Sequence, residues 1–184
     1  MLKRRIFLSL VSEQLALYAQ EKRLSEQTLA RWQAWAEEDQ KAFLVVAQEL
    51  QLGENHLRDF LDWLEEIVRR DGGTVRDLLA RPEILQPLEA KFSRNDKLKA
   101  VKEGLRKLRY PHLWRLQESL RETVRALDLG GRVHISFPPT LEGDEVTIAM
   151  KVRNVQELTE SLLRLRQRLD DGMLQRIFDL LDQV

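Results

Sequence analysis

Residues 131–152, GRVHISFPPTLEGDEVTIAMKV, carry the one clear β pattern in a chain whose other segments have helical spacing. Apolar side chains alternate with mostly polar ones on both sides of the loop PPTLEGD, which is typical of strands with one buried face. The loop is too short for a crossover helix, so we expect an antiparallel hairpin. Two strands alone are only marginally stable in water, so other parts of this chain or a second copy must cover them.

Helical patterns fill the rest of the chain, with apolar residues recurring every three or four positions. Such stretches lie at 6–20, 25–36, 37–52, 54–71, 74–80, 82–92, 93–110, 111–129, 155–169 and 173–184. The predicted fold is therefore mainly α: a helical N-terminal part followed by an α-β-β-α unit with one antiparallel hairpin. Pro82 and Pro87 favour a boundary near them. We predict two domains, residues 1–92 and residues 93–184.

Composition removes several classes of protein from consideration. The 184 residues include no cysteine, which excludes disulfides, thiolate zinc sites and cysteine nucleophiles. Basic and acidic residues number 30 each, so the net charge indicates no partner. No apolar run approaches the roughly 20 residues of a membrane span, and the start MLKRRIFLSL has no small-residue cleavage site. We expect a cytoplasmic protein without membrane association, located at the nucleoid if it binds DNA.

Candidate catalytic and metal-binding residues are few. The histidines are His56, His112 and His134. None has metal-ligand spacing, and the P-loop, G-x-G-x-x-G and G-x-S-x-G motifs are missing from the sequence. One predicted helix face carries Asp59, Asp62, Glu65 and Glu66. Acid–base chemistry would need a cleft that this pattern does not indicate, so we interpret it as a solvated face. We expect no enzymatic activity, cofactor, metal or small-molecule substrate.

The most charge-biased segment is residues 93–116, with eight basic and two acidic side chains. Lys99, Lys102, Arg106 and Arg109 form one stripe of a predicted helix, beside an apolar stripe that could dock on the protein. One interpretation is contact with nucleic-acid phosphates. The predicted contact residues are Lys97, Lys99, Lys102, Arg106, Lys107, Arg109 and Arg115. The other interpretation is an ordinary solvated face that pairs with acids elsewhere in the chain.

Residues 43–62 can also be aligned with a helix-turn-helix. Gln51 occupies the turn position that usually requires glycine, and the second helix is rich in acids that phosphates would repel. We therefore expect a helical packing unit there, not a base-reading motif.

The hairpin edges suggest an interface, because unpaired strand edges invite pairing with another chain. Two copies could form a four-stranded sheet with two-fold symmetry. The predicted dimer-interface residues are Val133, Ile135, Phe137, Val146, Ile148 and Met150. The alternative is a monomer whose hairpin lies on its own helices.

Two segments resemble the C-terminal half of ParB-type partition proteins. Residues 19–67 are similar to the helical stretch that follows the DNA-reading motif in that family. Lys22, Leu24, Ser25, Leu29 and Ala30 hold places comparable to the family's "G-x-L-S-x-x-x-A" helix start, with Lys22 where glycine is favoured. Residues 113–165 look like the family's helix-strand-strand-helix dimerisation unit.

The resemblance implies a homodimer and mainly non-specific DNA contact. The family's N-terminal nucleotide-binding domain has no counterpart here, so CTP turnover and centromere-site recognition are not carried over. The chain would be a stand-alone relative or a fragment of a longer protein. The predicted function is a non-enzymatic, DNA-associated dimerising module of a ParB-like partition or DNA-organising protein. The alternative is a helical protein–protein interaction adaptor that binds no nucleic acid.

Overall fold

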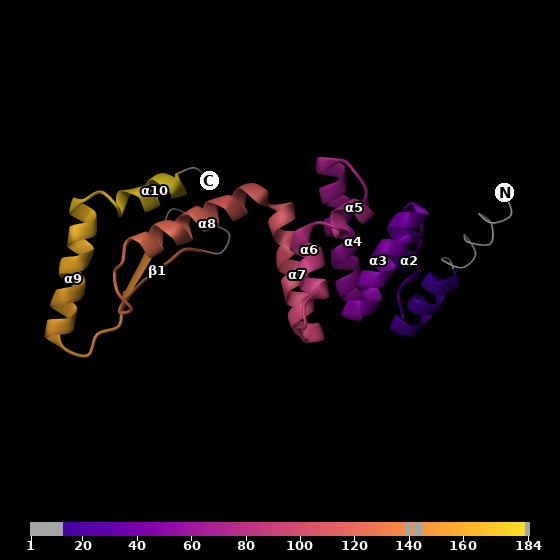
Figure 1. The fold of residues 1–184 in the computed structure, drawn as a ribbon, viewed down its shortest axis with the longest axis horizontal. Helices are drawn as coiled ribbons and strands as arrows, with labels where there is room; N and C mark the ends of the chain where they lie inside the picture. The colour runs from indigo at the N-terminus through magenta and orange to yellow at the C-terminus, as the bar shows by residue number, and fades with distance from the viewer. Residues whose placement is uncertain (1–12, 139–140, 142–144, 183–184) are drawn as a thin grey trace. The chain divides into compact units, whose positions relative to one another are not determined.

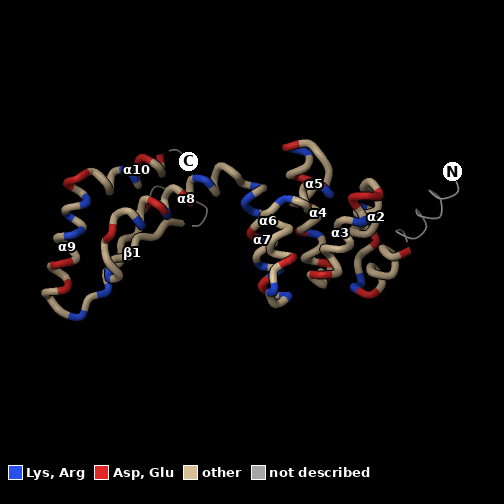
Figure 2. The backbone as a smooth tube through the Cα atoms, viewed as in Figure 1, with Lys and Arg blue, Asp and Glu red and all other residues tan. Residues whose placement is uncertain are grey.

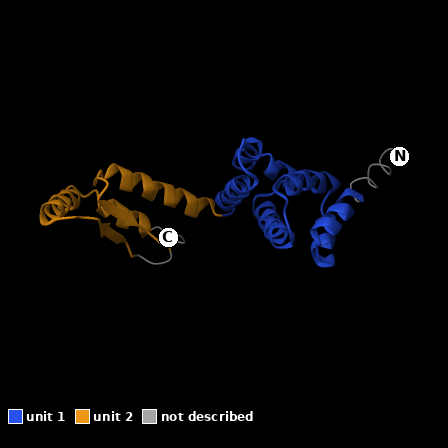
Figure 3. Cartoon of the chain, turned by 90° about the horizontal axis from the view of Figure 1, so that it is seen from below, with its two compact units in different colours: residues 1–109 blue, residues 110–184 orange. Residues whose placement is uncertain are grey.

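The computed structural model describes residues 13–138, 141 and 145–182. It confirms the predicted fold class, because the described part is mainly helical with one antiparallel hairpin (Figure 1). The chain divides into two compact units, residues 1–109 and residues 110–184 (Figure 3). No helix among the described residues combines the length and apolar character needed to cross a bilayer.

The regular elements in the described part of unit 1 are helices. Residues 13–22 are helical. They are followed by α2 (Glu26–Gln33), α3 (Glu37–Leu50), α4 (Glu54–Asp71), α5 (Val75–Leu79), α6 (Pro82–Glu89) and α7 (Arg94–Arg109). Local chemistry sets several boundaries: the Ser25 side chain accepts a hydrogen bond from the Thr28 backbone N–H at the start of α2, and Pro82 opens α6. Gly72, with φ of 77°, ends α4 in a conformation that glycine adopts without strain.

Aromatic side chains form the centre of the unit 1 core. Trp32 packs edge-on against Phe43 with ring centroids 5.0 Å apart, and Tyr18 meets Trp32 edge-on at 6.1 Å. The Tyr18 hydroxyl donates to the carbonyls of Ala47 and Leu52, both at 2.8 Å. Burial raises the pKa of Tyr18 to about 12. This core joins the helix before α2 to the turn between α3 and α4.

Glu54 ties the N-terminus of α4 to that of α2. Its carboxylate accepts from Thr28 Oγ1 at 2.7 Å and from the Ser25 backbone N–H at 3.1 Å. Burial by itself would raise the pKa of Glu54, but these hydrogen bonds outweigh it and hold the pKa below the ordinary 4.5. These hydrogen bonds therefore favour the ionised carboxylate.

Helix α7 belongs to unit 1, although the sequence placed a boundary between residues 92 and 93. Leu98, Val101 and Leu105 are buried in the unit 1 core, and the Arg70 guanidinium of α4 donates to the Leu108 carbonyl at 2.6 Å near the α7 C-terminus. Both prolines lie in α6, Pro82 as its first residue and Pro87 inside it, and not in a linker. The units meet at residues 109 and 110 instead.

Unit 2 contains the hairpin. Its elements are α8 (Pro111–Ala126), β1 (Val133–Ser136), β2 (Thr147–Met150), α9 (Val155–Asp170) and α10 (Gln175–Leu181). The strands are antiparallel, with Val133 opposite Met150 and Ile135 opposite Ile148. A second core cluster joins α8, β1 and α10, and its buried members include Leu120 and Ile177. By contrast, the buried residue of α9 is Ser161.

Gly104 allows α6 and α7 to approach closely. A Cβ at this position would lie 2.2 Å from the Glu83 backbone oxygen, so a side chain would push the helices apart. We expect Gly104→Ala to lower the free energy of unfolding of unit 1 by about 1–3 kcal/mol, the usual cost of overpacking. Urea unfolding followed by tryptophan fluorescence measures this, because Trp32, Trp35 and Trp63 lie in unit 1.

Gly53→Ala is the matched control, because nothing lies within 4 Å of a Cβ there. A Gly104→Ala midpoint no lower than that of Gly53→Ala would contradict the close approach of the two helices.

Candidate functional site

Three of the predicted phosphate contacts on α7 form ion pairs with other helices of unit 1. Lys97 Nζ lies 2.6 Å from a Glu49 carboxylate oxygen on α3. Two further cations contact α4. Lys102 Nζ lies 3.3 Å from Asp59 Oδ2, and Arg109 lies 2.6 Å from Glu66 Oε2.

Lys102 has the most complete set of partners in this stripe. Its ammonium group lies 3.1 Å from His56 Nδ1 and 5.4 Å from the centre of the Trp63 ring, in addition to the Asp59 carboxylate. A cation over an aromatic face is stabilised by the ring quadrupole. His56 is thus a neighbour of the Lys102–Asp59 ion pair.

The acidic face of α4 is paired on its other side by α2. Arg31 lies 2.6 Å from Asp62 Oδ1 and 2.7 Å from Glu65 Oε2, and Trp35 Nε1 donates to Glu65 at 3.0 Å. The hydrogen bond to Glu65 raises the pKa of the Arg31 guanidinium above its ordinary value. The four acids predicted as a solvated face are therefore ion-pair partners that hold α2 and α7 to α4.

The other predicted phosphate contacts are not gathered into one site. Arg106 lies 3.9 Å from Glu103 of the same helix. Lys99 is exposed, whereas Lys107 has an interaction partner. Arg115 lies in unit 2, where its Nε donates to the Pro111 carbonyl at 3.2 Å. The arrangement favours the second interpretation of the stripe, in which its cations pair with acids elsewhere in the chain.

The predicted dimer-interface residues serve mostly the chain's own core. Val133 is buried in the unit 2 cluster. Ile135, Phe137, Val146 and Met150 are partly buried against the same cluster. Ile148 lies on the same face of the hairpin but is 39% exposed. The apolar face is thus covered by its own unit along β1 and left open at the centre of β2.

Ile148 lies at the edge of an open apolar groove of about 560 Å³, which we call the unit 2 groove. Its lining residues are Ile148, Leu162, Leu165, Arg166, Leu169, Asp170, Leu174 and Phe178. The exposed fraction is 48% for Leu162, 62% for Leu169 and 42% for Phe178. Grouped exposed apolar side chains of this kind mark interaction surfaces in proteins.

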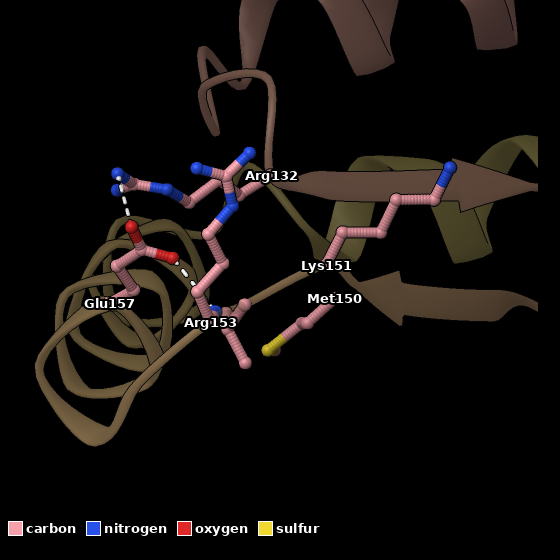
Figure 4. Close-up of a pocket in the computed structure, with 6 residues that line it drawn as sticks. Arg132, Met150, Lys151, Arg153 and Glu157 are labelled. Carbon is pink, nitrogen blue, oxygen red and sulfur yellow. Dashed lines mark hydrogen bonds and ion pairs between the residues drawn. The ribbon is translucent and has the colours of Figure 1, made fainter.

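A second hollow, of about 640 Å³, lies where β2 leads into α9 (Figure 4). Arg132 and Arg153 both line it, whereas the Lys151 side chain points away from them. Glu157 accepts from Arg132 at 3.1 Å and from the Arg153 backbone N–H at 2.9 Å. This hollow offers cations for an anionic partner but no arrangement of groups for acid–base or nucleophilic chemistry.

The described residues contain no group of three histidine, aspartate or glutamate side chains placed to hold a metal ion. His112 and His134 are both exposed. The sequence pattern of residues 155–169 predicts a helix but not the unit 2 groove beside it, although the leucine spacing along that helix could have indicated a second apolar face.

Comparisons of this chain with protein-family models, with curated proteins and with solved structures found no match. The resemblance to ParB-type proteins therefore stays a prediction from sequence patterns.

Lys102 has an ion-pair partner and an aromatic neighbour, whereas Lys99 of the same helix is exposed, so the two lysines can be compared. We expect Lys102→Ala to lower the free energy of unfolding of unit 1 by about 1 kcal/mol, because it removes a partly desolvated ion pair and a cation–π contact. Lys99→Ala should change it by less than about 0.5 kcal/mol, as is usual at exposed sites. Urea unfolding monitored by tryptophan fluorescence tests both, and equal midpoints for the two variants would contradict the difference.

Proposed function

We propose that this chain is a non-enzymatic protein-assembly module that self-associates through the unit 2 groove. The observation that carries the proposal is the row of exposed apolar side chains on β2, α9 and α10 around that groove. The ion pairs between α7 and its neighbours support the same choice, because they occupy cations that a DNA-binding helix would present. Among the predicted functions, assembly through protein contacts is therefore preferred.

The apolar area left to bury in the groove limits how strong this association can be. Fully burying a leucine or isoleucine contributes about 1.5–3 kcal/mol, and the groove side chains are already partly covered. Their remaining area must offset the loss of translational and rotational freedom on association. We therefore expect a dimer in the micromolar range, supported by contacts beyond the groove itself.

Adjacent residues of β2 provide a matched test. Ile148 belongs to the apolar face, whereas Thr147 points to the opposite face, and both are exposed. We expect Ile148→Glu to shift the chain from dimer to monomer at micromolar concentration, because a charge in the groove cannot be desolvated without a partner. Thr147→Glu should leave the dimer unchanged.

Sedimentation velocity of the full chain measures the oligomeric state, with circular dichroism to verify that both variants are folded. A wild-type chain that sediments as a monomer across this range overturns the proposal.

Nucleic-acid association is the second candidate function, in the ParB-like setting that the sequence pattern suggested. The observation that favours it is that Arg132 and Arg153 line the same hollow next to the start of α9 (Figure 4). Guanidinium groups bind phosphates through charge and paired hydrogen bonds without reading sequence. Such contact would be non-specific and would come from unit 2, not from the α7 stripe.

Charge reversal distinguishes these two locations. We expect Arg153→Glu to weaken duplex DNA binding at low salt and to reduce the slope of log affinity against log salt by about 1, for the one lost phosphate contact. Fluorescence anisotropy with a labelled duplex measures both quantities. If only Lys99→Glu weakens DNA binding, the contact lies on α7. If the wild-type chain binds no DNA at low salt, this function is excluded.

A further inference from the structure

The outer edge of β2 carries backbone groups that the hairpin leaves unpaired. Within the hairpin, the Lys151 backbone N–H donates to the Arg132 carbonyl at 2.8 Å. Hydrogen-bonding positions alternate along an antiparallel strand, so the backbone N–H and C=O groups of Val146, Ile148 and Met150 point away from β1. No described residue forms a hydrogen bond with the backbone groups of Ile148. Such an edge can pair with a further strand.

Side-chain exposure shows that β2 is the more accessible strand of the hairpin. Its residues Thr147, Ile148 and Ala149 are all exposed, and only Met150 is partly buried. In β1, by contrast, Val133 is buried in the unit 2 core. A strand that joins this sheet therefore meets the least obstruction at β2.

Two charged side chains flank Ile148 at equal distance along the chain. Glu145 lies three residues before it and Lys151 three residues after it, and both are exposed. Val146 packs on the unit 2 core together with Met150, so the alternation of faces extends to the start of this stretch. Glu145 and Lys151 thus lie on the polar face, opposite to Ile148. Neither forms an ion pair with a described residue.

The surroundings of Lys151 favour an acidic partner. Lys151 lies opposite Arg132 in the hairpin, and Figure 2 shows basic residues where β2 leads into α9. Like charges on neighbouring strands destabilise each other. Arg132 has two acidic partners, Glu157 at 3.1 Å and Glu160 at 3.4 Å, whereas Lys151 has none in the described part of the chain. An acidic side chain on a strand added at the β2 edge would therefore be stabilised beside Lys151.

A second β2 supplies that acidic side chain. In an antiparallel pair of β2 strands with its two-fold axis at Ile148, the two copies of Ile148 face each other, Val146 faces Met150 and Glu145 faces Lys151. Apolar side chains then meet on one face, and two ion pairs related by the symmetry form on the other. The outward-pointing backbone groups become hydrogen-bonded pairs in the same register. Any other position of the axis separates Glu145 from Lys151.

We propose that two copies of this chain associate by antiparallel pairing of β2 with β2, which forms a four-stranded sheet with the two-fold axis at Ile148. This inference rests on the proposed self-association and specifies its contact. It places a second Ile148 beside the first, at the edge of the unit 2 groove. The contact closes as a dimer, because each β2 edge is used once.

Charge reversal tests this register. We expect Glu145→Lys and Lys151→Glu each to weaken the dimer about tenfold, because each variant places like charges opposite each other at two positions. A mixture of the two variants should associate as tightly as the wild type, because every lysine then faces a glutamate. Glu122→Lys makes the same change of charge at an exposed position of α8 and should leave the affinity unchanged.

Sedimentation equilibrium of the full chain measures the dissociation constant for each variant and for the mixture. If neither reversal weakens the dimer, or if mixing restores nothing, the β2 pairing is overturned and the proposed self-association stands. A monomeric wild type overturns both.

Single-cysteine variants test the same register without relying on charge, and the chain has no cysteine of its own to interfere. Glu145 and Lys151 of the two copies would form a non-hydrogen-bonded pair, with Cα atoms about 4.5 Å apart, which is within disulfide range. We expect a mixture of Glu145→Cys and Lys151→Cys chains to form a disulfide-linked dimer on mild oxidation, in higher yield than either variant alone. Non-reducing electrophoresis measures the yields, and equal yields from the mixture and from the separate variants would overturn the register.

Discussion

Helix α4 holds unit 1 together because both of its faces are used. Its apolar face carries Phe60 into the aromatic core, where that ring stacks on Phe43 at 6.1 Å. The rest of its surface presents carboxylates that pair with Arg31 of α2 and with Lys102 and Arg109 of α7. The same pairs also neutralise part of the charge of the basic helix. Some of the cations predicted to contact phosphates thus take part in the packing of unit 1.

Unit 2, in contrast, leaves part of its apolar surface exposed. Its core joins α8, β1 and α10, whereas α9 buries little more than Ser161 and leaves its leucines open. A two-stranded sheet and three helices have too few elements to cover every apolar face they present. In the proposed function, a second copy of the chain covers this open apolar face.

The sequence predicted much of the local structure for identifiable reasons. Alternation over residues 133–136 and 147–150 indicates strands because successive side chains of a strand point to opposite faces. Pro82 and Gly72 mark helix ends because of backbone constraints that act within one or two residues. The domain boundary was harder to predict from the sequence, because prolines such as Pro82 and Pro87 occur in compact structure as readily as in linkers. Only the burial of Leu98 and Val101 shows that α7 belongs to unit 1.

The sequence by itself determined where helices and strands form, which faces are apolar and where charges concentrate, because each of these depends on residues a few positions apart. The tertiary structure decided which charges are paired and which apolar faces stay open. Lys97 and Glu49, or Lys102 and Asp59, are more than 40 positions apart along the chain and meet only when α7 packs on α3 and α4. The exposure of Leu162 also depends on tertiary structure, because it is set by which other elements pack against that side chain.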